Sequence, residues 1–439
     1  MSIRKFFLIF ILLIPVYNIC ISQVKIGVAL PLMSGSTDPE EKKTGQQMLN
    51  GINDALENYN STNPETKVTF DIEDTKRGMS ATLEILNKFG SDEKVIAIFG
   101  PVYSIELMNN AGAAAFHKIP TITPTATVNF LAQNNPYLFQ LNPTYDIRGR
   151  LMAKYAMTDL GMKNFIILSE DGYGKNIAGS FTDEVIKNNG KVEAVEYYTE
   201  DSVYLSSQLE NLRAKVMEKD KFIDFGNLTA NQSEKLKNYR IKFSNTDSLL
   251  NANLIVSIYK LFGKNAERIM DSLKIFPSTI TDKTKPVIAG YVDAVYIPIG
   301  SFNDIDKISL QYYSSGINLP ILGTSDWNNE KALKENSLYL KELYFDSDFY
   351  LKDGLNDEMT GMTDSDIKNY YFGYDGMKLI LDKIVNGNNT RDKLNSELEK
   401  TKHYKSFHND IDITDRTNRH MSIMYFNDGK LIKLKDFVY

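Results

Sequence analysis

The chain has 439 residues, a formal net charge of -6 and a pI near 5.5. Such an acidic balance argues against nucleic acid or an anionic lipid surface as the main partner. Because 42% of the residues are hydrophobic, the chain can bury a sizeable core. Its length corresponds to two or three domains of usual size.

Residues 1–22 have the pattern of a secretory signal peptide. Two basic residues precede the apolar run from Phe6 to Val16, which is too short to cross a bilayer as a mature helix. Small or polar residues then lead to a cleavage site expected after Ser22. No later run approaches the length of a transmembrane helix. We therefore expect an exported protein in the periplasm or another extracytoplasmic space.

An alternative for the same segment is a lipoprotein signal with Cys20 as the lipidated residue, although Ile19 stands where such a signal needs a small side chain. Lipid anchoring therefore stays open. The chain has a single cysteine, so a cut after Ser22 leaves no disulfide, thiolate nucleophile or cysteine-based zinc site. The four histidines show no HExxH or similar spacing. We expect neither a metal nor a cofactor.

From Val24 onward, apolar runs with the character of strands alternate with segments of helical periodicity. Strands are expected at 24–32, 68–74, 95–101 and 119–127, and helices at 48–59, 81–89 and 104–117. Strands and helices that alternate at this spacing are typical of βαβ units with a parallel sheet.

A second unit of the same kind begins near residues 143–148. Its expected strands are 165–169, 192–198, 287–298 and 319–324, and its expected helices are 176–187, 208–218 and 304–313. A helix at 370–385 and a hairpin at 421–434 complete the pattern. Residues 221–285 interrupt it, and apolar spacing in their middle predicts an inserted helical segment. The sequence therefore predicts two α/β lobes in tandem.

The stretch Gly172-Tyr173-Gly174 follows the strand at 165–169 and has the outline of a phosphate-binding loop. A dinucleotide loop would need a third glycine where Ile177 stands, and the GK[ST] ending of a P-loop is missing. Nucleotide binding is therefore disfavoured. Two interpretations remain, a simple strand-to-helix turn and a tyrosine aimed out of the carboxyl end of its strand, where open α/β sheets hold ligands.

Hydroxyl side chains follow two neighbouring strands of the first unit. Ser104 stands where a helix begins, so it can cap that helix or offer its hydroxyl to an anion beside unpaired backbone amides. Thr125 and Thr127 end the next strand. Singly, these residues are typical of a cap and a turn, but together they make a carboxylate pocket plausible.

These segments together resemble the type I periplasmic solute-binding proteins, specifically the branched-chain amino acid receptors of ABC importers. The resemblance rests on the order and spacing of "VKIGVALPLMSG", "GPVYS", "IPTITPTAT", "LSEDGYGKNIAGSF", "DAVYIPIG" and "YYFGYDGMKLILDKI". It covers nearly all of the mature chain except the insertion.

The resemblance implies a clamshell of two Rossmann-like lobes, each with a parallel-core sheet, joined by a three-stranded hinge. The first lobe would comprise residues 23–143 and about 352–409. The second would comprise 144–351 and about 410–439, with the helical insertion at 221–285.

By position in the family, the first lobe would grip the α-carboxylate of an amino acid with Ser104, Thr125, Ala126 and Thr127. Thr123 and Thr125 replace the usual serine and alanine of this stretch, which makes the pocket smaller and more polar.

From the second lobe, Tyr173 would close over the ligand, and the backbone near Ser301 and Phe302 would face the cleft. An acidic group of this lobe meets the α-ammonium in the family. Asp326 is the candidate here, with Ser325 at the expected place if the register shifts by one residue. Trp327 would either stack on the solute or pack in the core.

Two functions follow from the resemblance. In the first, a small solute such as an amino acid binds to one lobe and the hinge closes. The permease of an ABC transporter then recognises the closed, monomeric protein. In the second, a lobe pair without a small ligand regulates a partner in the cell envelope through 221–285 or the acidic stretch 353–366. The chain has no GxSxG elbow or other nucleophile motif, so an enzyme is disfavoured.

Overall fold

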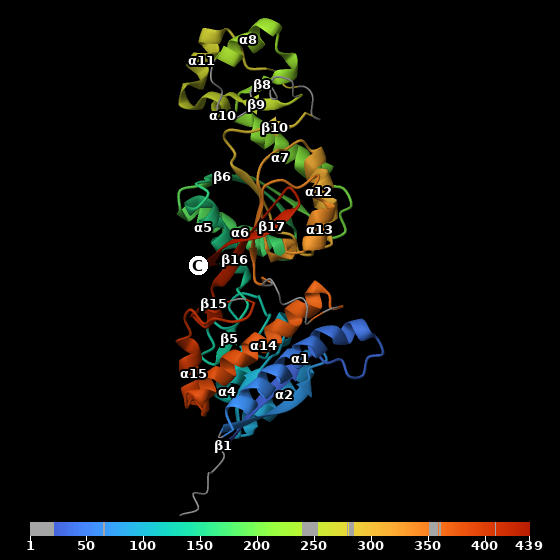
Figure 1. Ribbon diagram of the computed structural model, residues 1–439, viewed down its shortest axis with the longest axis vertical. Coiled ribbons are helices and arrows are strands. Elements are labelled where there is room, and N and C mark those ends of the chain that lie inside the picture. The colour runs from blue at the N-terminus through green and yellow to red at the C-terminus, as the bar shows by residue number, and fades with distance from the viewer. Residues whose placement is uncertain are drawn as a thin grey trace, which may run out of the picture.

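The computed structural model describes residues 22–64, 66–238, 253–278, 280, 285–350, 359, 361–408 and 410–439. Residues 1–21 of the predicted signal peptide, with Cys20, lie outside this set, as does the start of the stretch 353–366. The described elements form three regions that follow one another along the long axis of the molecule (Figure 1). Among the described helices, none has the length and apolar character that a membrane crossing requires.

The first lobe is built on a seven-stranded sheet with the order β14-β15-β5-β4-β3-β1-β2. All neighbouring strands run parallel except β14 and β15, which are antiparallel. The strands are β1 (Ser22–Leu30), β2 (Thr66–Asp74), β3 (Val95–Phe99), β4 (Thr121–Thr123), β5 (Leu138–Gln140), β14 (Ile413–Thr414) and β15 (Thr417–Asn418).

The helices of this lobe are α1 (Pro39–Thr62), α2 (Met79–Ser91), α3 (Ser104–Leu107), α4 (Gly112–Phe116), α14 (Asp364–Val385) and α15 (Arg391–Glu399). Two of them, α1 and α14, lie side by side (Figure 1). The two backbones approach so closely at Gly51 that a Cβ there would lie only 2.1 Å from the Tyr370 carbonyl oxygen. The absence of a side chain at Gly51 permits this contact. Thr363 and Asp366 form a capping box at the start of α14.

The second lobe repeats this plan with the strand order β17-β16-β13-β12-β11-β6-β7. Its core from β13 to β7 is parallel, and β16 and β17 add an antiparallel edge. The strands are β6 (Asn164–Glu170), β7 (Lys191–Tyr198), β11 (Ala294–Ile297), β12 (Ile321–Gly323), β13 (Leu343–Ser347), β16 (His420–Asn427) and β17 (Lys430–Val438). The helices are α5 (Tyr145–Thr158), α6 (Tyr173–Lys187), α7 (Ser206–Glu218), α12 (Asp304–Ser314) and α13 (Glu330–Glu335). The predicted fold class, two mostly parallel α/β lobes, is confirmed.

The chain passes between the lobes three times. The crossings follow β5, β13 and β15, because in each case the next element belongs to the other lobe. The third crossing comes at Arg419, later than the predicted boundary at 409. The reason is that β14 and β15 still pair within the first sheet, where Thr417 lies opposite Gln140.

The segment predicted as a helical insertion contains strands as well as helices. A small sheet with the order β10-β9-β8 joins β8 (Phe222–Asp224), β9 (Ile255–Ser257) and β10 (Val287–Ile288). Helices α8 (Ala230–Asn238), α10 (Ile258–Phe262) and α11 (Ala266–Leu273) accompany it, with 3-10 turns at Phe225–Asn227 and Gly263–Asn265. These elements share a hydrophobic cluster of their own, and they lie at the end of the molecule beyond the second lobe (Figure 1).

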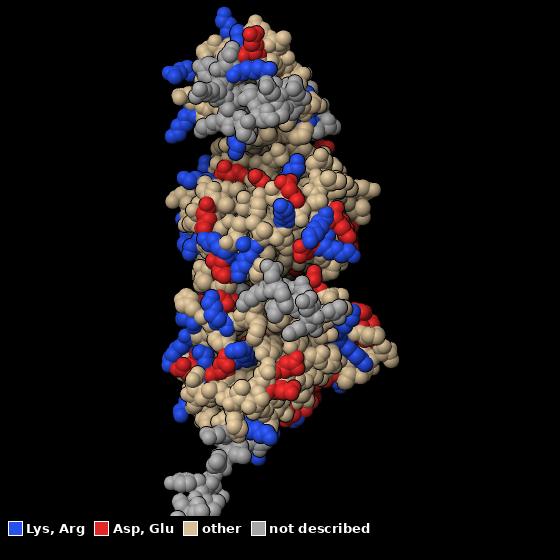
Figure 2. Space-filling model, viewed as in Figure 1, with Lys and Arg blue, Asp and Glu red and all other residues tan. Residues whose placement is uncertain are grey.

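Charged side chains of both signs are interspersed over the two lobes on the face shown in Figure 2. That face therefore presents no extended basic surface of the kind that nucleic acid requires.

Candidate ligand site between the lobes

On the first lobe, Ser104 stands at the start of α3, just beyond the carboxyl end of β3. Its Oγ accepts hydrogen bonds from the backbone amides of Thr127 at 3.1 Å and Val128 at 3.2 Å. The hydroxyl of Ser104 therefore ties the ends of two neighbouring strands together. Its own hydrogen is not used in these two bonds and can be donated to an acceptor.

The neighbouring candidates Thr125 and Ala126 are engaged by the protein itself. Thr125 Oγ1 donates to the Val102 carbonyl at 2.7 Å. Ala126 is buried in a small apolar cluster, and its carbonyl accepts a hydrogen bond from Gln140 Nε2 at 3.1 Å. These contacts shape the loop. Among the predicted first-lobe residues, the hydroxyls of Ser104 and Thr127 donate no hydrogen bond within the described part of the chain.

On the second lobe, Tyr173 begins α6, and its hydroxyl lies close to the carboxylate of Asp326. A Cβ on Gly174 would lie 2.5 Å from the Pro298 carbonyl oxygen. Gly174 thus lets the start of α6 approach the end of β11. Asp326 lies in the 3-10 turn Ser325–Trp327 that follows β12.

A tyrosine that the sequence did not single out connects the two halves. The backbone amide of Tyr145 donates to the Thr127 carbonyl at 3.0 Å, and the Tyr145 ring packs edge to face on Tyr173 with centroids 4.9 Å apart. We call the series Ser104, Thr127, Tyr145, Tyr173 and Asp326 the interlobe contact chain. It brings four of the predicted residues into one continuous arrangement.

The other second-lobe candidates do not belong to the interlobe contact chain. Ser301 Oγ accepts from the Asn303 amide at 3.2 Å, and the side chain of Phe302 is exposed. The preceding Gly300 adjoins Tyr173, so this loop lies next to the interlobe contact chain. Trp327 is fully buried, and its Nε1 donates to the Ile297 carbonyl at 2.9 Å. Of the two roles considered for Trp327, the structure supports packing in the core.

Beneath the interlobe contact chain lies a buried ionic cluster centred on Arg148 of α5. Its guanidinium donates to Asp348 Oδ2 at 2.9 Å, to Asn142 Oδ1 at 2.7 Å and to the hydroxyl of Ser325. Lys368 of α14 also contacts Asp348, at 2.7 Å. The cluster therefore joins the first and second crossings to the turn that carries Asp326. Sequence reasoning missed Arg148, because its partners are distant along the chain.

The acidic side chains of this cluster differ in their electrostatics. Burial raises the pKa of Asp348, but Lys368 and Arg148 outweigh it and hold the pKa well below its usual range. Burial raises the pKa of Asp346 to about 8, because Arg148 offsets it only in part. Burial also raises the pKa of Asp326, against the opposing effect of Arg148. Asp348 is thus the fixed anion of the cluster, whereas Asp326 ionises more readily if a cation arrives.

One oxygen of Asp326 has no hydrogen-bond partner. The Oδ2 atom is buried, and it accepts no hydrogen bond from the part of the chain that the structure describes. A buried acceptor of this kind costs free energy until a donor satisfies it. The site therefore offers a carboxylate acceptor on one lobe and a hydroxyl donor, Ser104, on the other.

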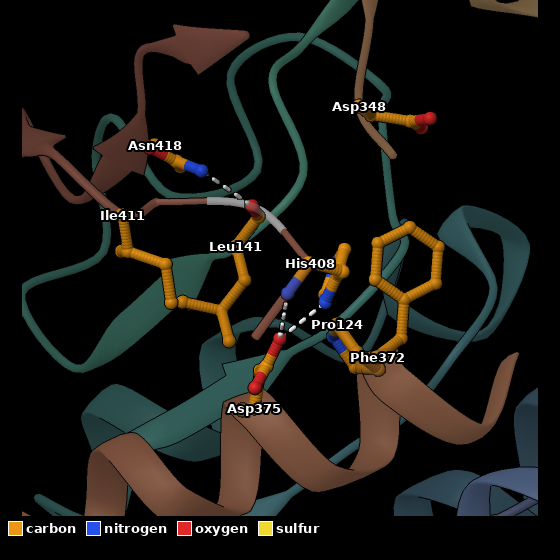
Figure 3. A pocket seen from close by; sticks show the side chains of 9 residues that line it. Pro124, Leu141, Asp348, Phe372, Asp375, His408, Ile411 and Asn418 are labelled. Carbon is orange, nitrogen blue, oxygen red and sulfur yellow. Dashed lines mark hydrogen bonds and ion pairs between the residues drawn. The ribbon is translucent and has the colours of Figure 1, made fainter. Parts of the chain in front are cut away.

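A narrow cavity lies beside the three crossings (Figure 3). Leu141, Asp348 and Asn418, one from each crossing, contribute to its lining. At its floor, Asp375 pairs with the ring of His408 and accepts from the His408 backbone amide at 3.1 Å. Burial raises the pKa of Asp375, but the His408 ring and the backbone amides of Phe407 and His408 outweigh this effect and lower the pKa. This pair fixes the last segment before the third crossing to α14.

Among the described residues, one group has the composition of a metal site, namely Asp410, His420 and Asp436. Both carboxylates already have cationic partners, because Lys405 contacts Asp410 and Lys433 lies 2.7 Å from Asp436. These residues therefore take part in ion pairs beside the third crossing.

The fold consists of two α/β lobes that the chain joins by three crossings. Residues 23–218 match the family model described as periplasmic binding protein. Over the described chain as a whole, the molecule has the fold of periplasmic binding proteins. The resemblance stated from the sequence is confirmed. Proteins of this family are exported to the periplasm and bind ligands without catalysing a reaction on them. Among curated proteins, none matches the sequence.

Three solved structures to which the chain is similar show this fold. One is the branched-chain amino acid binding protein LivJ of Streptococcus pneumoniae in complex with isoleucine, with 18% identity, a TM-score of 0.54 and coverage of 95% of this chain and 99% of that one. Another is a putative branched-chain amino acid ABC transporter protein of Rhodospirillum rubrum, with 14% identity, a TM-score of 0.66 and coverage of 94% and 100%. A third is a solute-binding protein of R. palustris in complex with 4-hydroxybenzoate, with 14% identity, a TM-score of 0.58 and coverage of 95% and 97%.

Proposed function

We propose that the protein binds an amino acid or a similar small zwitterion between its lobes and presents it to the membrane permease of an ABC importer. The observation that carries the proposal is the unpartnered Oδ2 of Asp326, which stands at the end of the interlobe contact chain. An α-ammonium group supplies both the donor and the positive charge that this buried carboxylate lacks.

The opposite end of the interlobe contact chain suits a carboxylate. Ser104 can donate its hydroxyl hydrogen there, and the start of α3 adds backbone amides of the same polarity. The rings of Tyr145 and Tyr173 stand between the two polar ends. A ligand whose anionic and cationic groups lie a short distance apart could therefore face Ser104 with its carboxylate and Asp326 with its ammonium group.

The three crossings provide the hinge for closure. Arg148 and Asp348 fix the base of the cleft, so a rotation of the lobes would change the distance between Ser104 and Asp326 while the base stays in place. Closure also removes water from the ligand's charges and strengthens each contact. Isoleucine and 4-hydroxybenzoate, the ligands named for two structures of this fold, share a carboxylate, which supports the choice of Ser104 as the anion-facing group.

The test is to denature the purified mature protein and identify the released small molecules by mass spectrometry. A thermal-shift screen of amino acids, amides and small carboxylates on ligand-stripped protein accompanies it. We expect a zwitterion to be released, and the same compound to raise the melting temperature in a concentration-dependent way. If no compound is released and none stabilises the protein, the proposal fails, and the alternative of a regulatory lobe pair takes its place.

A further inference from the structure

A second candidate site lies outside the cleft, in a groove between α1 and α14. The groove has a volume of about 350 Å³ and is open to solvent. It is lined by Asp54, Glu57 and Asn58 of α1, by Tyr370, Tyr371 and Tyr374 of α14, and by Phe407. None of these residues belongs to the interlobe contact chain or to the ionic cluster of Arg148.

The four aromatic rings of the groove form a closed circuit. Tyr370 meets Tyr371 edge to face at 5.2 Å and 89°, and Tyr374 meets Phe407 in the same way at 5.2 Å and 83°. Tyr370 and Tyr374 are nearly parallel at 6.2 Å and 19°, as are Tyr371 and Phe407 at 6.4 Å and 28°. The rings thus stand in two crossed orientations around one space. Ring faces carry the negative end of the aromatic quadrupole.

The charged residues of the groove are acidic. Asp54 and Glu57 are exposed, and neither forms an ion pair with a lysine or arginine in the described part of the chain. The Tyr370 hydroxyl donates to Asp54 at 2.7 Å, and Asn58 Nδ2 donates to the Tyr374 hydroxyl at 3.0 Å. These bonds hold two of the rings in place. The groove therefore combines fixed aromatic walls with an uncompensated negative rim, which attracts cations.

We propose that this groove binds a small organic cation with an alkylated nitrogen, of the quaternary ammonium class. Aromatic walls attract such a cation through their quadrupoles, and its weak hydration makes it easy to desolvate. A metal ion suits the groove poorly, because Ca²⁺ or Mg²⁺ needs several oxygen ligands at 2.0 to 2.6 Å, whereas four of the seven lining side chains are aromatic.

The experiment is a calorimetric titration of the full mature protein with choline, alongside 3,3-dimethyl-1-butanol, which has the shape of choline without its charge. We expect saturable one-to-one binding of choline and about tenfold or weaker binding of the neutral analogue, because the charge supplies the cation–π attraction. If choline shows no saturable binding, or if the neutral analogue binds equally well, the proposal is overturned.

Variants locate the binding. Phe407→Leu removes one wall, and we expect it to weaken choline binding about fivefold or more. Glu57→Gln alters an exposed residue with no packing role, and it should weaken binding about twofold to fivefold at low salt and less at high salt.

Asp326→Asn separates this groove from the cleft. The groove proposal predicts unchanged choline binding in this variant, since Asp326 lies in the interlobe contact chain. Loss of choline binding in Asp326→Asn, together with normal binding in Phe407→Leu and Glu57→Gln, would place choline in the cleft and overturn the proposal. Because choline and the cleft solute are titrated separately, failure of one proposal is distinguishable from failure of the other.

Discussion

Arg148 and Asp348 form a buried ion pair, with Nη2 and Oδ2 separated by 2.9 Å, that ties α5 of the second lobe to the second crossing between the lobes. Both side chains are almost fully buried. Each charge is compensated by the other and by neighbouring polar groups, and the pair joins segments of two of the three crossings between the lobes.

Replacing Arg148 should destabilise the protein strongly. Arg148→Met leaves Asp348 buried with one cationic partner fewer, and we expect the free energy of unfolding to fall by about 3 to 5 kcal/mol. Arg148→Lys should rescue little, because one ammonium cannot reach the four acceptors that the planar guanidinium serves on Pro143, Ser325, Asn142 and Asp348. Urea denaturation of the three proteins measures this. An Arg148→Met variant as stable as the wild type would show that the ion pair does not hold the hinge.

The buried carboxyl of Asp346 should make the protein less stable as the pH rises. Its pKa of about 8 in the folded state exceeds the value near 4 expected for an unfolded chain. Between these values the folded state keeps a proton that the unfolded state has lost, so the free energy of unfolding falls by up to about 1.4 kcal/mol per pH unit. This contribution is complete below pH 4 and is lost as the pH passes 8.

Asp346→Asn should remove this slope while keeping the shape of the side chain. We expect its stability relative to the wild type to increase steadily from pH 5 to pH 8 in urea titrations. Asp348→Asn is the matched control, because the low pKa of Asp348 predicts the opposite sign, a loss of stability at neutral pH. If Asp346→Asn and the wild type have the same pH profile, the carboxyl of Asp346 does not titrate in this range.

Tyr173→Phe should weaken the structure around Asp326. The variant keeps the ring that packs on Tyr145 but removes the hydroxyl that lies close to the carboxylate of Asp326. An interaction of a hydroxyl with a charged carboxylate contributes about 1.5 to 3 kcal/mol, and we expect a loss of stability of up to this order. Tyr145→Phe also keeps the ring contact and should cost less. Equal stability of both variants and the wild type would mean that the hydroxyl of Tyr173 faces water instead.

Binding of the proposed zwitterion should weaken with acidification at a higher pH than an ordinary aspartate would cause. The raised pKa of Asp326 means that a proton competes with the ammonium group above the usual range. An ammonium group favours the ionised carboxylate, so binding near this pKa should release protons. Calorimetry in buffers of different ionisation enthalpy detects that release. Its absence in the wild type, or its persistence in Asp326→Asn, would contradict the assignment.

Much of the candidate site could be predicted because it depends on local pattern. Ser104, Thr127 and Tyr173 each follow an apolar strand, and the carboxyl ends of parallel strands meet at one edge of a sheet. Arg148 and Asp348 have no such signal, because 200 residues separate them and only the folded hinge brings them together.

The insertion shows a similar limit on prediction. Its helices have helical periodicity, but β8 and β9 contain three residues each and β10 contains two. Strands this short give too few positions for alternation to appear. The predicted strand 287–298 also proved to be two strands, with β10 in the insertion and β11 in the second lobe. An apolar run alone does not reveal that its halves join different sheets.

The most direct test of the account is a calorimetric comparison of solute binding by the wild type, Asp326→Asn and Asp183→Asn, using the compound that mass spectrometry identifies. Asp183 is an exposed aspartate on α6 of the same lobe and serves as the control. We predict that Asp326→Asn weakens binding by about tenfold or more, as the loss of about 1.5 to 3 kcal/mol implies, while Asp183→Asn binds normally. Equal affinity of all three proteins would contradict the claim that a cationic ligand group meets Asp326 between the lobes.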